Sequence, residues 1–151
     1  MPGGTSTLKV RDLTVAFGQV VAVRDVSLTA REGETVAIFG ANGSGKTTFL
    51  KAVAGLVPAT RGKVAWRGED VTALPAHERA ARGMRYVSDR SRVATRMTVL
   101  QNLEAGAWLL PASRWSGARE RVFSLFPALA SMARSPAGVL SGGERQMLIL
   151  G

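Results

Sequence analysis

The segment Gly40-Ala41-Asn42-Gly43-Ser44-Gly45-Lys46-Thr47 restricts the fold more than any other part of this chain. It has the form G-x-x-x-x-G-K-T. The run Thr35–Phe39 before it reads as a short buried strand, and the large apolar residues of Thr48–Leu56 after it recur at helical spacing. Strand, glycine loop and helix in this order predict a phosphate-binding loop.

The chemistry of phosphate binding explains these residue types. Successive backbone N–H groups must turn inward around a polyphosphate, which residues without a Cβ permit. The helix that follows directs its positive end at the same anion. Lys46 adds a positive charge for the terminal phosphates, and the Thr47 hydroxyl can ligate Mg²⁺. A glycine-rich turn before an ordinary helix is the alternative, but a chance match to this pattern is rare. We therefore predict nucleotide binding.

Composition narrows the class of protein. The apolar fraction of 46% is high enough for a packed core and too high for a disordered tail. No apolar run approaches the ~18 residues of a membrane span, and no basic-then-apolar signal begins the chain. There is no cysteine for a disulfide or a thiolate metal site. We expect a soluble protein in the cytoplasm.

The net charge of +9 leaves the partner open. A basic chain can bind nucleic acid, anionic lipid or nucleotide, and an arginine-favouring genome produces the same balance. The arginines between Arg79 and Arg96 form either a docking surface or a solvated face. The solvated face is the simpler interpretation.

The first part of the chain predicts a small antiparallel sheet. Residues 1–7 are expected to be disordered. Residues 8–34 contain three short apolar segments joined by tight turns, at 8–17, 20–23 and 26–30, and strands joined in this way pair antiparallel.

The rest of the chain predicts an α/β core followed by helices. Residues 35–90 should form the core around the phosphate loop, with further strands at 63–67 and 84–87 and a helix at 75–82. Residues 91–146 offer helical patterns at 98–110 and 116–126 and no strand candidate, which predicts an inserted helical subdomain.

A second motif, Leu140–Gln146, opens another helix. Ser141 and Glu144, three residues apart, form a capping box. Gly142 and Gly143 between them leave the first-turn N–H groups bare, which suits a close anionic partner.

Together the two motifs resemble those of ATP-binding cassette ATPases, the motor subunits of ABC transporters. Gly40–Thr47 is similar to their Walker A loop, and Leu140–Gln146 is similar to their LSGGQ signature, with Glu144 where Gln is usual. The resemblance covers residues 8–151. It implies an α/β P-loop NTPase core with an N-terminal antiparallel β subdomain and an inserted helical subdomain, incomplete at the C-terminus.

Finer features, such as Leu74–His77, Met97–Val99 and Leu125–Pro127, look like the ATP-binding subunits of branched-chain amino acid importers. The resemblance implies a protein that couples ATP binding and hydrolysis to uptake of branched-chain amino acids or a similar small polar solute. The implied partners are a second ATPase subunit, transmembrane permease subunits and, indirectly, a solute-binding protein outside the membrane. Nucleic acid is not expected, and the implied location is the inner face of the cell membrane.

The resemblance also assigns roles to single residues. Lys46 and Asp89 become catalytic, with Asp89 at the Q-loop position, and Thr47 and Asp89 become Mg²⁺ ligands. Thr48 joins the loop residues around ATP, and Ser141–Glu144 contact the nucleotide of the second subunit. Phe17 is implied to stack on adenine in the A-loop, although spacing alone favours a core aromatic at a strand end.

The family pattern continues beyond the signature with a Walker B strand, a catalytic Glu and a switch His, none of which is found within residues 1–151. Without a group that orients water, we expect weak nucleotide binding and little hydrolysis from residues 1–151. The strand before the loop would also present a bare apolar edge, a predicted aggregation site. The sequence therefore reads as a fragment of a longer protein.

Two other functions fit parts of the pattern. One is a nucleotide-binding regulator without catalysis, which would bind ATP but not turn it over. The other is a soluble cassette protein that acts on nucleic acid or ribosomes, for which salt-sensitive retention on RNA or DNA is the discriminating observation.

Overall fold

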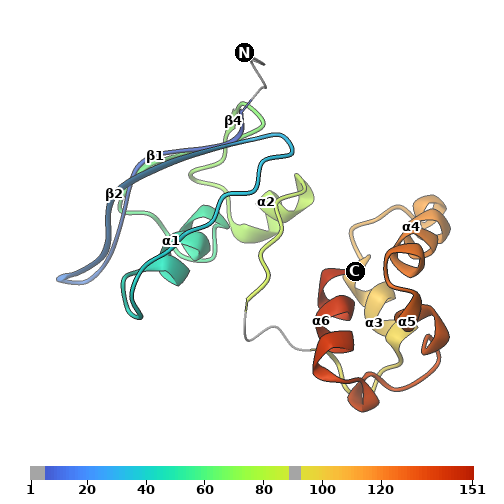
Figure 1. Cartoon of the computed structure of the whole chain (residues 1–151). Coiled ribbons are helices and arrows are strands. Elements are labelled where there is room, and N and C mark those ends of the chain that lie inside the picture. Colours follow the sequence, from blue (N-terminus) through green and yellow to red (C-terminus); the bar gives the residue numbers. More distant parts are fainter. Residues whose placement is uncertain (1–5, 89–92) are drawn as a thin grey trace. The chain divides into compact units, whose positions relative to one another are not determined.

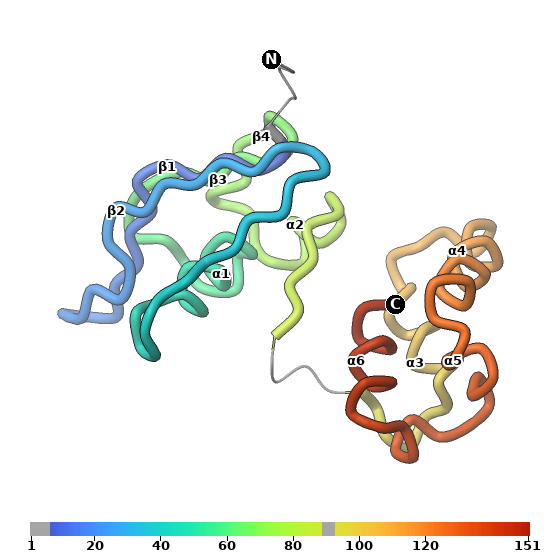
Figure 2. Tube along the Cα trace, viewed as in Figure 1, coloured from blue at the N-terminus to red at the C-terminus, as the bar shows by residue number. Residues whose placement is uncertain are grey.

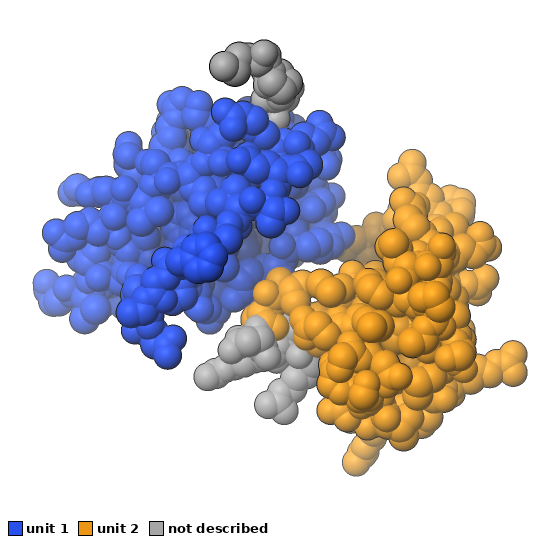
Figure 3. Space-filling model, viewed as in Figure 1, with its two compact units in different colours: residues 1–86 blue, residues 87–151 orange. Residues whose placement is uncertain are grey.

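The computed structural model describes residues 6–88 and 93–151 and divides the chain into two compact units, residues 1–86 and 87–151 (Figure 1, Figure 3). The first unit carries the sheet and two helices, and the second is helical (Figure 2). Among the described residues no helix has both the length and the hydropathy to cross a membrane.

The sheet of the first unit is antiparallel, with strand order β2-β1-β3-β4. Its strands are β1 (Ser6–Phe17), β2 (Val20–Arg31), β3 (Arg61–Trp66) and β4 (Glu69–Asp70). The prediction of three strands within 8–34 was wrong in one respect, because the second and third are a single strand. The pairing of β2 with β1 shifts register at several points, and these irregularities allow β2 to continue as one strand through the break in its apolar pattern. β1 begins at Ser6, so the expected disorder does not extend through residues 6 and 7.

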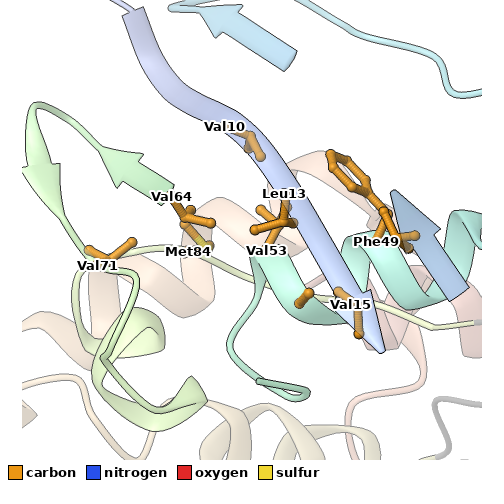
Figure 4. Close-up of a cluster of buried hydrophobic side chains, with 10 residues drawn as sticks. Val10, Leu13, Val15, Phe49, Val53, Val64, Val71 and Met84 are labelled. Atoms are coloured by element: carbon orange, nitrogen blue, oxygen red, sulfur yellow. The ribbon is translucent and has the colours of Figure 1, made fainter. Parts of the chain in front are cut away.

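One face of this sheet packs on α1 (Lys46–Val53), and Figure 4 shows the shared core. The inward side chains of β1 alternate along the strand, as a half-buried strand requires, except between Val10 and Leu13, where the register with β2 shifts. They meet Phe49 and Val53 of the helix, and β3 adds Val64. The strand residues at the centre, each no more than 1% exposed, are Val10, Leu13, Val15 and Val64.

The helix α2 (Ala76–Ala81) begins immediately after Pro75, which is its N-cap rather than its first helical residue. Arg79 on this helix is buried, with 3% of its surface exposed. It donates to the carbonyls of Ala52 and Val53 at the end of α1, at 3.0 and 2.6 Å, and to those of Leu74 and Thr72, at 2.9 and 2.8 Å. The interpretation of Arg79 as part of a solvated face was wrong, because its side chain is buried and its hydrogen bonds hold the end of α1.

Two predicted strands are not strands in the structure. Residues 35–39 and 84–87 have no strand pairing, although each precedes a predicted site segment. A strand exists only where a neighbour accepts its backbone hydrogen bonds, and no described residue pairs with either segment. Phe39, predicted to be buried, is 90% exposed.

The second unit is helical, as predicted. Its helices are α3 (Val99–Gly106), α4 (Ala112–Leu125), α5 (Pro127–Ser131), the 3₁₀ helix η1 (Ala137–Val139) and α6 (Gly142–Leu150). The second predicted helix begins at Ala112 rather than at 116, and the short α5 and η1 were not predicted. The buried side chains of these helices, together with Leu140 between η1 and α6, form one core, made of Val99, Leu103, Leu129, Ala137, Leu140 and Leu148.

Candidate phosphate-binding site and its family

The loop between residue 39 and α1 takes its shape from glycine. Gly43 and Gly45 have φ of 81° and 92°, in the left-handed region that L side chains rarely adopt. Gly45 is also the N-cap of α1, and a Cβ there would collide with the backbone carbonyl of Ala22 on β2. The loop therefore lies against β2, and no other residue fits at its last turn.

The N-terminus of α1 is open to an anion. The first N–H groups of a helix have no intrahelical acceptor, and Gly45 supplies no side-chain cap. The first turn also contains no acidic residue that would compete for these N–H groups. Partial positive charge therefore faces the loop without internal compensation.

Lys46 places its ammonium group within the loop. The Nζ atom donates to the carbonyls of Gly40 at 2.8 Å and Ala41 at 2.7 Å. The side chain is half-buried, so its positive charge is held beside the open helix terminus. Amides, helix terminus and ammonium together form a site for a multiply charged phosphate.

The two threonines after Lys46 differ in exposure. Thr47 is exposed on the first turn of α1, and its hydroxyl has no partner among the described residues. Thr48 is half-buried. A free hydroxyl oxygen beside a phosphate site fits a hard cation such as Mg²⁺, so the residues present fit the predicted metal at Thr47. Asp89, the other predicted ligand, lies outside the described residues.

Phe17 is at the end of the β1–β2 hairpin, where it pairs with Val20 across Gly18. Its surface is 53% exposed, so the structure excludes the simpler interpretation of a core aromatic. The same end of the hairpin carries Ala22, which Gly45 approaches. An exposed ring at the end of β1 therefore belongs to the hairpin whose other strand, β2, contacts the phosphate loop.

The second motif begins α6 with the predicted capping box. The Ser141 hydroxyl accepts from the Glu144 N–H at 3.3 Å, and the Glu144 carboxylate accepts from the Ser141 N–H at 2.8 Å. Hydrogen bonds from the Ser141 backbone N–H and then its side chain hold the pKa of Glu144 below its usual value. Gly142 and Gly143 are exposed, and a Cβ would meet open space at either. This motif belongs to the second unit, whereas the loop belongs to the first.

Some residues of the first unit that shape the site were not found from the sequence. No sequence pattern indicated the burial of Arg79, because an arginine on a short helix usually points to solvent. Thr60 donates its N–H to the Thr14 carbonyl at 2.8 Å, and its hydroxyl accepts from the Ala16 N–H at 3.0 Å. It fixes β1 just before Phe17, and no spacing rule indicates such a contact.

A comparison with protein-family models matches residues 23–151 to the family described as ABC transporter. That segment includes the phosphate loop, α1 and the α6 motif. The chain belongs to the ABC transporter family. The resemblance inferred from its two motifs is therefore confirmed.

Curated relatives of this ABC protein carry several names. The chain is 35% identical over 135 residues to the high-affinity branched-chain amino acid transport ATP-binding protein BraG of Pseudomonas aeruginosa, covering 89% of this chain and 58% of BraG. It is 32% identical to a probable branched-chain amino acid transport ATP-binding protein LivF of Archaeoglobus fulgidus, covering 95% and 61%. It is also 38% identical to the lipopolysaccharide export system ATP-binding protein LptB of Haemophilus influenzae, covering 93% and 59%.

Solved structures confirm the α/β cassette fold. The chain superposes on a nucleotide-free ATP-binding cassette with a TM-score of 0.79 at 24% identity, covering 96% of this chain and 63% of that one. It superposes on the ADP conformation of another ATP-binding cassette with a TM-score of 0.78 at 23% identity, again covering 96% and 63%. The ABC chain described here thus spans about three fifths of the length of the proteins it matches.

Proposed function

We propose that this chain is the nucleotide-binding part of an ABC importer subunit that couples ATP binding and hydrolysis to uptake of a small polar solute. The observation that carries the proposal is the loop itself. An uncapped helix terminus, two left-handed glycines and the Lys46 ammonium converge on one exposed position. Such a set of donors fits the triphosphate of ATP better than a singly charged ligand.

Each residue of the loop has a distinct role in this proposal. Exchange of the Gly40 and Ala41 carbonyls for phosphate oxygens would give Lys46 a charged acceptor in place of neutral ones. Thr47 would hold Mg²⁺, which neutralises charge on the phosphates, and Asp89 would be the second group near the metal. Phe17 would stack on adenine, because its ring is exposed at the end of the hairpin whose strand β2 contacts the loop.

The motif at the start of α6 needs a second subunit to complete its role. Its exposed glycine amides and the Ser141 hydroxyl can donate to phosphate, yet they belong to the unit that does not contain the loop. Two cassettes arranged head to tail would place the Ser141–Gly143 segment of one against the ATP of the other. We therefore propose a dimer of ABC ATPase subunits, bound to permease subunits at the inner face of the membrane.

Branched-chain amino acids are the proposed solute. Two of the curated relatives are named for transport of these amino acids. Another is named for lipopolysaccharide export, so uptake of radiolabelled leucine, with and without the gene, is the direct measurement. Equal leucine uptake with and without the gene would refute branched-chain amino acids as the solute and would point to another one.

The binding proposal is tested by Lys46→Ala in the full native chain. We expect Mg·ATP affinity to fall at least 10-fold, because one ammonium–phosphate interaction is lost. Lys51→Ala is the matched control, since Lys51 lies on the last turn of the same helix. Equal affinities of the parent and the Lys46→Ala variant, measured by calorimetric titration, would refute the proposal. Binding without any turnover in the assembled dimer would favour a regulator instead of a motor.

A further inference from the structure

The β1–β2 hairpin contains two residues in a strained backbone conformation that the phosphate site does not explain. Asp12 and Asp25 have φ of 48° and 47°, in the left-handed region, although each lies inside a 12-residue strand. Non-glycine residues seldom adopt this conformation, and although Asp does so more often than most, it is uncommon inside a strand. Both coincide with shifts in the β1–β2 register, which mark bulges.

The two strained residues are held in the same way. The Ser27 hydroxyl accepts from the Asp12 N–H at 2.9 Å and donates to its carboxylate at 3.0 Å. The Thr14 hydroxyl accepts from the Asp25 N–H at 3.1 Å and donates to its carboxylate at 2.9 Å. Each hydroxyl lies on the opposite strand from its aspartate, so the hairpin is fixed at two bulges from both sides.

Beyond these bulges the hairpin turns away from the plane of the sheet, toward the side where α1 lies (Figure 1, Figure 2). The turned end brings Ala22 and Val23 against Gly45 of the phosphate loop. The same end carries Phe17, and Thr60 fixes its backbone through Thr14 and Ala16. The direction of the turn therefore decides where the Phe17 ring lies relative to the loop.

We infer that Thr14 and Asp25, at the bulge nearer the hairpin end, are positioning residues that direct Phe17 to the base of the nucleotide. The inference rests on the proposed function. Phe17 is exposed, so side-chain packing does not set its direction and the backbone must. The reciprocal hydrogen bonds between Thr14 and Asp25 constrain that backbone within three residues of the ring.

A base-selective readout separates this role from a general contribution to folding. ATP engages both the base contact and the phosphate loop, whereas inorganic tripolyphosphate engages only the loop. Thr14→Val removes the hydroxyl and keeps a β-branched strand residue. We expect roughly 3- to 10-fold weaker ATP binding and less than a twofold change for tripolyphosphate, as a fraction of the roughly 5- to 150-fold loss from deleting a stacked aromatic.

The matched control is Thr29→Val, an exposed threonine of β2 whose hydroxyl has no partner among the described residues. It should leave both affinities unchanged. In a Phe17→Ala background, Thr14→Val should have no further effect on ATP binding, because the group it positions is gone. All variants are measured in the full native chain, by competition against a fluorescent ATP analogue.

Three results would overturn the inference: equal losses for ATP and tripolyphosphate, an unchanged ATP affinity, or an additional loss in the Phe17→Ala background. The proposed function fails by a different result, namely Lys46→Ala leaving both ligands unaffected. If Lys46→Ala weakens both and Thr14→Val weakens neither, the nucleotide site stands and only the positioning role is refuted.

Discussion

Two helices of this chain, α1 and α6, both begin with glycines beside a polar motif, yet their N-termini are built differently. Gly45 caps α1 without a side chain, and Lys46 adds a positive charge. Ser141 and Glu144 cap α6 with each other, and Glu144 adds a negative charge. The first terminus leaves its donors for a ligand, whereas the second has already used part of its capacity within the chain.

Because of this difference, the α1 loop contains all the donors expected of a phosphate site, whereas the α6 motif is expected to supply only part of one. A multiply charged anion at α1 finds amides and an ammonium group together. At α6 it finds exposed glycine amides and a hydroxyl beside a carboxylate. We therefore expect an anion to bind at α6 only beside a second positive site, which the proposed dimer would supply.

The largest expected effect concerns the other end of α1. Arg79→Met should lower the free energy of unfolding of the first unit by about 3 kcal/mol or more, because four carbonyls lose their donor, those of Ala52 and Val53 in buried hydrogen bonds and those of Thr72 and Leu74 in partly buried ones. Chemical denaturation monitored by circular dichroism measures it. Arg82→Met is the control: it removes exposed ion pairs with Glu69 and Glu78 and one exposed hydrogen bond to the Glu78 carbonyl, and should cost less than about 1 kcal/mol.

The next effect tests the two glycine starts directly. Gly45→Ala should destabilise the first unit by about 2–3 kcal/mol and abolish ATP binding, since its Cβ collides with Ala22 and its φ is left-handed. Gly143→Ala, placed in open space within α6, should keep the stability within about 1 kcal/mol. Equal destabilisation by both substitutions would contradict the contrast between the two termini.

A smaller effect is expected from the α6 cap. Ser141→Ala should cost about 1 kcal/mol, because it removes the acceptor for the Glu144 N–H. Hydrogen exchange of the α6 amides gives the local free energy. No comparable loss should appear in α1, and a loss spread over both units would count against a local cap.

The smallest effect is a dependence on pH that only α6 should show. The folded-state pKa of Glu144 is depressed by its hydrogen bonds to Ser141. Its contribution is therefore present above the unfolded-state pKa and is lost as the pH falls through the folded-state pKa. The protection factors of the α6 amides, that is, their exchange rates relative to the intrinsic rates at the same pH, should fall in that acidic window and should not depend on it in Glu144→Gln. A similar loss of amide protection at acidic pH at the start of α1 would contradict the proposed difference between the two helix termini.

The sequence was sufficient for segments whose structure depends on local chemistry. The glycine loop, the helix after it and the Ser141–Glu144 capping box need only neighbours in the chain, and all appear as predicted. The alternation of Leu8 to Phe17 likewise identified β1. Family membership followed because the two motifs are specific at their spacing.

Features that depend on distant partners could not be predicted. Residues 35–39 read as a buried strand, but a strand requires a neighbour that no described residue provides. The burial of Arg79 depends on carbonyls that lie up to 27 residues away in sequence. The role of Asp89 stays a prediction, because the residue lies outside the described part of the chain.

The two cores of the chain have no residue in common among the described positions. Substitutions that repack the helices around Leu129 need no compensating change around Leu13. The packing of the helical unit and that behind the glycine loop can therefore change independently of one another over evolution.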